Sequence, residues 1–167
     1  MAAVADHQSL ADFEAKYQHS DRAYEYWYGE AVPKASPTWI HGLLQGILIQ
    51  LLREAGFAAG SEIELRIAPD ARPRPDVIAT RKPVAEAYPT SAVEVAVEIL
   101  SPDDSMSYVL QKCQAYARWG FAYVYVVDPE SRQLFRWTAS GLELADKLIE
   151  TPSARIWQLL EESLLGK

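Results

Sequence analysis

Two carboxylates, Asp76 and Glu98, lie in segments that a β-sheet can bring together. Asp76 opens a short apolar run that predicts a strand over residues 76–80, and Glu98 lies late in an alternating run that predicts a strand over residues 91–100. Neighbouring strands lie about 4.8 Å apart, so two acids on the same face of adjacent strands can bind one divalent cation. Glu94 is a poorer partner for Glu98, because four residues along one strand span about 13 Å.

Lys112 can add a positive charge to this pair. It lies at the flank of the apolar face of a predicted helix, from which a long side chain can reach over the end of the sheet. Such a set can hydrolyse a phosphodiester: the carboxylates hold a hard cation, the cation acidifies a water, and the ammonium orients that water or the phosphate. Each residue also has an ordinary explanation, as a turn acid, a salt-bridged strand glutamate or a surface lysine. The hypothesis therefore depends on the set.

The stretches around these residues resemble a known family. In chain order the matching features are Gly29-Glu30, a Ser-Pro helix start followed by His41, Pro75-Asp76, Glu98 followed by Ile-Leu-Ser-Pro, and Lys112. This set is similar to the bacterial family of putative restriction endonucleases, which belongs to the PD-(D/E)-x-K nuclease superfamily. The similarity covers roughly residues 24–137. It implies an α/β fold of the restriction endonuclease-like type, with a central mixed β-sheet flanked by helices.

The resemblance also implies roles for single residues. Asp76 and Glu98 would be metal ligands, and the backbone carbonyl of Ile99 would be a third ligand. Leu100 stands where the superfamily's lysine normally lies. In this family that lysine is typically displaced onto the following helix, which matches Lys112.

Two more residues are candidates for supporting roles, and one position departs from the family. His41 matches a histidine near the start of the first long helix and would contact a phosphate or water, although a helix-edge histidine can equally make a structural hydrogen bond. Glu64 is expected to approach the site from a neighbouring strand. The family often carries an acid four residues before the helix lysine, whereas this chain has Tyr108. This departure is expected to weaken a second metal position or a hydrogen bond to Lys112.

The charge distribution sets one basic segment apart from an acidic chain. Sixteen Lys and Arg against 23 Asp and Glu leave a net charge of -7, so the overall field opposes non-specific binding to phosphate backbones. Residues 66–82 hold five basic groups against two acids, and Arg72 and Arg74 are candidates for contact with a substrate phosphate. The same composition would suit a solvated Pro-rich loop.

The composition predicts a globular chain. With 167 residues, 49% of them apolar, the chain is long enough to bury one core, which excludes a disordered or fibrous protein. We expect residues 1–167 to form one nuclease-like domain, with residues 1–20 as an N-terminal extension and a C-terminal helix over 153–165.

The single cysteine, Cys113, excludes an internal disulfide and a Cys-based zinc site, and it fits a reducing compartment. The first ten residues show no signal-peptide pattern, and the longest apolar stretch is far shorter than a membrane span. We therefore expect a cytoplasmic protein with no membrane partner.

Periodicity and capping signals predict the secondary structure. The expected elements are a weak helix around residues 10–17, a hairpin over 23–32 about Gly29, a helix from Ser36 closed by Gly56, strands over 62–67, 76–80 and 91–100, a helix from Ser101 to Gly120, strands over 121–127 and 133–137, and a helix over 153–165.

The leading hypothesis is an endonuclease that hydrolyses DNA phosphodiesters with Mg²⁺ or Mn²⁺, because oxygen ligands favour these ions over Zn²⁺. One alternative is an inactive nuclease-fold module that binds nucleic acid or protein, which the acidic charge and Tyr108 favour. Another is a metal-dependent hydrolase of a different phosphate ester. Cutting both strands of a duplex needs two sites, so a nuclease of this kind is expected to be a homodimer.

Overall fold

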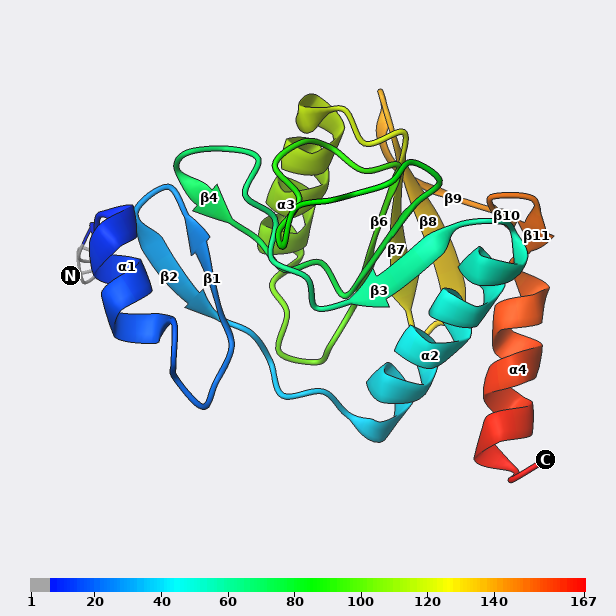
Figure 1. Ribbon diagram of the computed structural model, residues 1–167. Helices are drawn as coiled ribbons and strands as arrows, with labels where there is room; N and C mark the ends of the chain where they lie inside the picture. Colours follow the sequence, from blue (N-terminus) through cyan, green and yellow to red (C-terminus); the bar gives the residue numbers. More distant parts are fainter. Residues whose placement is uncertain (1–6) are drawn as a thin grey trace.

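The structure is a computed structural model, and it describes residues 7–167. Residues 1–6 lie outside the described residues. They are the first part of the expected N-terminal extension and of the segment that shows no signal-peptide pattern. The structure has four helices, of which α2, α3 and α4 flank a six-stranded mixed sheet, as Figure 1 shows; this confirms the predicted fold class. Within residues 7–167, no helix is both long enough and apolar enough to cross a membrane.

The elements follow the chain in this order: α1 (Leu10–Tyr17), β1 (Tyr24–Trp27), β2 (Glu30–Pro33), α2 (Trp39–Glu54), β3 (Ala58–Ser61), β4 (Ala71–Arg72), β5 (Val77–Thr80), β6 (Val95–Ile99), α3 (Met106–Trp119), β7 (Tyr123–Asp128), β8 (Gln133–Thr138), β9 (Gly141–Leu144), β10 (Lys147–Leu148), β11 (Thr151–Pro152) and α4 (Ala154–Leu164).

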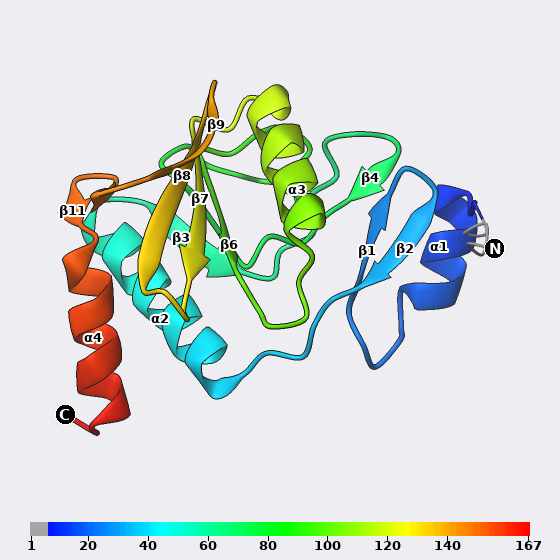
Figure 2. The same ribbon diagram turned by 180° about the vertical axis from the view of Figure 1, so that it is seen from behind.

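The six-stranded sheet has the order β3-β5-β6-β7-β8-β9. Its neighbouring strands are antiparallel except for β6 and β7, which run parallel. The reason is the connection: α3 carries the chain back along one face of the sheet before β7 begins (Figure 2). Loop 100–105 and the start of α3 therefore lie at the end of the sheet where β6 finishes.

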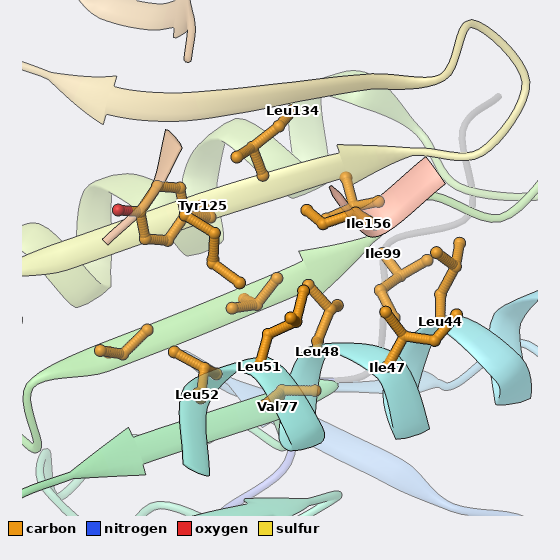
Figure 3. Close-up of a cluster of buried hydrophobic side chains, with 14 of the residues drawn as sticks. Leu44, Ile47, Leu48, Leu51, Leu52, Val77, Ile99, Tyr125, Leu134 and Ile156 are labelled. Atoms are coloured by element: carbon orange, nitrogen blue, oxygen red, sulfur yellow. The ribbon is translucent and has the colours of Figure 1, made fainter. Parts of the chain in front are cut away.

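The two faces of this sheet are covered by different helices. Helices α2 and α4 pack on one face, where Leu48 and Leu51 of α2 belong to one buried cluster with Val77, Ile99 and Tyr125 of three neighbouring strands (Figure 3). Helix α3 packs on the other face, against Ile78, Ala96 and Val126. Alternation along β5 and β6 thus directs even-numbered residues toward α3 and odd-numbered residues toward α2.

A second, three-stranded sheet, β2-β1-β4, lies on the far side of α3 (Figure 1). Its middle strand alternates: Tyr26 packs on Phe13 of α1, whereas Trp27 stacks on Trp119 of α3 with ring centroids 5.9 Å apart. Glu25 shares the α3-facing side with Trp27. The predicted hairpin about Gly29 is confirmed, and the carboxylate of Glu25 in its first strand faces α3.

One predicted strand is absent from the described residues: the segment Glu62–Ile67 is a loop. Glu62 has a φ of 58°, a left-handed conformation that ends β3 at Ser61. The backbone N–H groups of Leu65 and Arg66 donate to Pro73 and Pro89 in other loops and make no ladder. The strand prediction, which relied on the alternation of Ile63, Leu65 and Ile67, is therefore wrong. Of these three residues only Leu65 is fully buried, so they do not form the buried face of a strand.

Two helix starts were also predicted too early. Helix α2 begins at Trp39 because the hydroxyl of Thr38, and not that of Ser36, caps it by accepting from the N–H of His41. Helix α3 begins at Met106 because Ser105 is its cap, while Ser101 and Asp104 close a separate turn. The remaining predicted elements are present with boundaries shifted by a few residues, and β3, β4 and β9–β11 were not anticipated.

Candidate functional site

The register of β5 and β6 brings Asp76 and Glu98 face to face. Val77 pairs with Val97, so Asp76, one residue before β5, lies opposite Glu98. Both side chains belong to the set that points toward α3, and both residues are more than nine-tenths buried. The structure therefore places two carboxylates side by side at one end of the sheet, as the sequence pattern predicted.

The backbone of Ile99 faces the same place. Its N–H donates to Oδ2 of Asp76 at 2.7 Å, whereas the next residue, Leu100, pairs with Val127 of β7. In an extended strand the N–H and C=O of one residue point to the same side. The carbonyl oxygen of Ile99 is thus on the Asp76 side of β6, and Ile99 lines the cavity there.

Lys112 reaches this pair from the second turn of α3. Its Nζ lies 2.9 Å from Oε1 of Glu98 and 3.0 Å from Oε2 of Glu25, and the side chain is 5% exposed. Tyr116, one turn further along α3, donates its hydroxyl to the same Oε1 of Glu98 at 2.7 Å. Glu98 is therefore held by two side chains of α3.

Glu25 is a site residue that the sequence reasoning missed. This buried carboxylate receives the N–H of Arg74 at 2.6 Å, the hydroxyl of Tyr108 at 2.5 Å and the ammonium of Lys112. Tyr108 therefore supports Lys112 through Glu25. One signal in the sequence could have pointed to it: Glu25 alternates with the aromatic residues of its strand and lies two residues from Trp27, so the two share one face.

Lys34, Glu62 and Gln45 were also missed. The Lys34 ammonium lies 2.6 Å from the carbonyl oxygen of Arg74, 2.9 Å from Oε2 of Glu62 and 3.2 Å from Oδ1 of Asp76. The amide of Gln45 donates to Oε1 of Glu62 and to the Asp76 carbonyl. No local pattern points to Lys34, because it lies in the loop after β2 and meets its partners only in the folded chain.

His41 lies in the first turn of α2, beside Asp76. Its Nε2 is 3.4 Å from Oδ1 of Asp76. Its Nδ1 is buried and has no hydrogen-bond partner in the described part of the chain. The imidazole therefore holds Asp76 through Nε2, while its Nδ1 stays buried.

Three candidates lie away from this cluster. Glu64 accepts hydrogen bonds from Arg66 and Arg74, and Arg72 donates to the carbonyls of Ala68 and Ala71. None of Glu64, Arg72 and Arg74 lines the cavity described for residues 7–167; Arg74 contributes its backbone N–H and C=O to Glu25 and Lys34.

Burial and neighbouring charges move the pKa values of the acids in opposite directions. Burial raises the pKa of Glu98 to about 7, with further increases from Asp76 and Glu25 that Lys112 only partly offsets. Burial also opposes ionisation of Asp76, but a hydrogen bond from His41 and the charge of Lys34 outweigh it and lower its pKa well below the usual value. The pKa of Glu25 is lowered, because Lys112 and Lys34 outweigh its burial.

Both lysines of the cluster keep their charge. Burial alone would lower the pKa of each ammonium. For Lys34 the charges of Asp76 and Glu25 reverse this effect, and for Lys112 the charges of Glu25 and Glu98 do so, which places both pKa values above the usual one.

The cluster lines a cavity of about 270 Å³ and carries an excess of negative charge. Four carboxylates (Glu25, Glu62, Asp76 and Glu98) face two ammonium groups (Lys34 and Lys112), so the ionised set has a net charge of -2 before His41 is counted. This excess of carboxylates favours the binding of a cation.

The donor atoms also suit a hard cation. Within residues 7–167, no three His, Cys, Asp or Glu side chains are grouped as a metal cage. Mg²⁺ does not need such a cage, because it keeps several waters and binds proteins through one or two carboxylates. Asp76, Glu98 and the Ile99 carbonyl provide two carboxylates and one carbonyl oxygen, so the residues present fit this ion.

Comparison with known proteins identifies the relatives of this chain. The model of a family described as "Uma2: Putative restriction endonuclease" matches residues 10–162. The crystal structure of a protein from Anabaena variabilis ATCC 29413, described as a putative nuclease belonging to DUF820, superimposes with a TM-score of 0.75. It is 21% identical over 91% of this chain and 98% of that one, which shows a shared fold. No curated protein sequence matches the chain.

Proposed function

Because the chain belongs to the Uma2 family of restriction endonuclease-like proteins, we propose that it hydrolyses DNA phosphodiester bonds with Mg²⁺ or Mn²⁺ bound at Asp76 and Glu98. The observation that carries this proposal is the buried group of Asp76, Glu98 and Lys112, in which two carboxylates lie opposite each other and the ammonium is 2.9 Å from Glu98. The family match and the nuclease-like fold support a nuclease in general terms.

Asp76, Glu98 and the Ile99 carbonyl would hold the cation. A bound divalent ion supplies charge neutralisation at the phosphate and a more acidic water. The protein contributes orientation: the N–H of Ile99 and the imidazole of His41 fix the Asp76 carboxylate, and the Tyr116 hydroxyl fixes that of Glu98. These contacts hold the ligands in place before substrate arrives, which lowers the cost of reorganisation.

Lys112 would act as a charged hydrogen-bond donor. Its pKa lies above the usual value, so it keeps its proton at neutral pH and does not serve as a base. Glu25 and Glu98 use two of the three ammonium hydrogens, and the third is left to orient the attacking water or a phosphate oxygen. His41, which lines the cavity, would approach a phosphate or water from the other side of Asp76.

We further propose that residues 1–167 form one nuclease-like domain and that two copies act together. The three-stranded sheet supplies Glu25, and the six-stranded sheet supplies Asp76 and Glu98, so the site needs both parts. Cleavage of both strands of a duplex would need two such sites, which a homodimer provides.

The test measures metal binding and cleavage on the same samples. Mg²⁺ and Mn²⁺ are titrated into the protein by calorimetry, and nicking of a supercoiled plasmid is followed with each ion. The variants are Asp76→Asn, Glu98→Gln and Lys112→Ala. Glu150→Gln is the matched control, because this glutamate is exposed and lies outside the residues that line the cavity.

We expect Asp76→Asn and Glu98→Gln to lose metal binding and nicking, Lys112→Ala to lose nicking, and Glu150→Gln to keep both. Metal binding without nicking, also on single-stranded DNA and RNA, would favour a hydrolase of another phosphate ester. No binding at millimolar metal would overturn the proposal and leave a nuclease-fold binding module. Sedimentation of the wild-type protein separately tests the homodimer.

A further inference from the structure

The Lys34 ammonium lies in a cage of oxygen atoms. Two carboxylates and one backbone carbonyl surround it at 2.6–3.2 Å: Glu62, Asp76 and Arg74. An ammonium has three hydrogens to donate, so these oxygens use all of them. The cage is also stabilised from outside, because Gln45 donates to the other oxygen of Glu62 and to the Asp76 carbonyl.

These oxygens are the ligand types that a hard divalent cation prefers. Asp76 faces two ways: Oδ2 accepts from Ile99 on the Glu98 side, and Oδ1 faces Lys34 on the Glu62 side. In two-metal sites the ions lie about 3.5–4 Å apart and together clamp the attacking and leaving oxygens of the reaction. Lys34 and His41 both contact Oδ1, whereas Oδ2 accepts a neutral backbone N–H, so Asp76 presents one oxygen toward Glu98 and the other toward Lys34. A carboxylate shared between two cations would need the same arrangement.

The backbone keeps Lys34 at this position. Its N–H donates to the carbonyl of Ala23, which extends the β1–β2 pairing by one residue, and its carbonyl accepts from Nε of Arg22. The side chain therefore starts from a fixed point at the end of the hairpin, and 12% of it is exposed.

We propose that Lys34 occupies the place of a second divalent cation, so that this chain binds one metal ion where a two-metal site would bind two. This inference rests on the proposed function for the first ion, held by Asp76 and Glu98. Lys34 is then a positioning residue: it holds the Asp76 carboxylate and supplies a permanent positive charge on the side of Asp76 away from Glu98.

The experiment counts Mn²⁺ ions bound to the full-length protein. Calorimetry and the electron paramagnetic resonance of Mn²⁺ are measured for the wild type, Lys34→Met, the double variant Lys34→Met/Glu62→Gln, and Lys147→Met. Methionine removes the charge and keeps an unbranched apolar side chain. Lys147 is the matched control, because it is half exposed and pairs only weakly with Glu150 outside the cavity.

We expect one Mn²⁺ per chain in the wild type and two in Lys34→Met, with spin–spin coupling between the two ions in the resonance spectrum. The double variant should return to one ion, because Glu62 would be a ligand of the second, and Lys147→Met should match the wild type. Circular dichroism checks that each variant folds; if Lys34→Met does not, Lys34→Gln replaces it.

The outcomes separate this inference from the proposed function. A second ion on removal of Lys34, in a chain whose wild type binds one, supports the inference. A wild type that binds no ion contradicts the proposed function, on which the inference rests. Two ions in the wild type, no gain in the folded Lys34 variant, or a gain that Glu62→Gln does not reverse would overturn the inference.

Discussion

The two halves of the site each pair a lysine with two carboxylates, but only Lys112 is fully buried. Lys112 projects from α3 in the core, and its partners Glu25 and Glu98 are at most 7% exposed. Lys34 projects from the loop after β2, and one of its partners, Glu62, is 41% exposed. The same ionic chemistry is therefore buried on one side and partly exposed on the other.

This difference in solvation should decide how much each lysine contributes. Charges held in a low-dielectric interior interact strongly, and each becomes costly when its partner is lost. A pair with one exposed member is screened by water and contributes little. We infer that the Lys112 half is a rigid structural unit and that the Lys34 half can change its occupant.

Removing each lysine in turn tests the difference between the two halves most directly. Lys112→Met leaves two buried carboxylates without a cation, and we expect it to lower the free energy of unfolding by about 3–5 kcal/mol. Lys34→Met should cost about 1–2 kcal/mol, because Asp76 keeps the N–H of Ile99 and Glu62 can hydrate. Urea unfolding followed by circular dichroism measures both, with Lys147→Met as the control. Equal losses would mean that the two halves do not differ.

The pH dependence of metal binding should follow Glu98 and not Asp76. Glu98 has a pKa near 7, so below that pH a cation must displace a proton. Apparent Mn²⁺ affinity should therefore rise with pH by up to about tenfold per unit between pH 5 and 7, and level off above 7. Asp76 is already ionised throughout this range, because its pKa is lowered. Calorimetry in buffers of different ionisation enthalpy counts the proton released, and a flat profile would contradict the role of Glu98.

The raised pKa of Glu98 also predicts how the stability of the metal-free protein changes with pH. The pKa of Glu98 is higher in the folded state than its ordinary value of 4.5, so between pH 4.5 and 7 the folded protein binds more protons than the unfolded chain. The contribution of Glu98 to stability should fall as the pH rises through this window. Glu98→Gln should remove that slope in unfolding curves, and a slope that persists would assign it to another group.

A smaller change, Tyr108→Phe, tests the support of Lys112 through Glu25. It removes the hydroxyl that donates to Glu25 and keeps the ring that lies beside the Lys112 ammonium. We expect a loss of about 1 kcal/mol in unfolding free energy, since Lys112 and the N–H of Arg74 still bind Glu25. Thermal unfolding and Mn²⁺ stoichiometry are the measurements; a change in stoichiometry would show that Tyr108 acts on the metal site directly.

The smallest effect is expected for Glu62→Gln in the wild-type background. Glu62 is partly exposed, so its ion pair with Lys34 should contribute about 0.2–1 kcal/mol. Raising the salt concentration should shrink this difference further, whereas the cost of Lys112→Met should hardly change with salt. Urea unfolding at low and high salt provides the comparison. A salt-independent loss above about 2 kcal/mol would mean that Glu62 behaves as a buried partner, like Glu25 and Glu98.

Much of the fold could be predicted from the sequence, because it depends on local patterns. The alternation over β6, the helical spacing of α2 and α3, and Gly120 at the end of α3 act over a few residues. Prediction failed at Glu62–Ile67, where an alternating pattern occurs without a partner strand and the backbone bonds to other loops. Strand pairing depends on what lies alongside, which alternation alone does not specify.

The sequence by itself predicted that Asp76, Glu98 and Lys112 would lie together, since two acids at strand ends and a lysine on the next helix can meet if the strands pair in register. Only the tertiary structure decided that Glu25 and Lys34 join them. Glu25 meets Tyr108 across 83 positions of the chain, and Lys34 meets Asp76 across 42. Such contacts exist because the three-stranded sheet packs on α3 and places the hairpin over the end of the six-stranded sheet, and no local pattern encodes that packing.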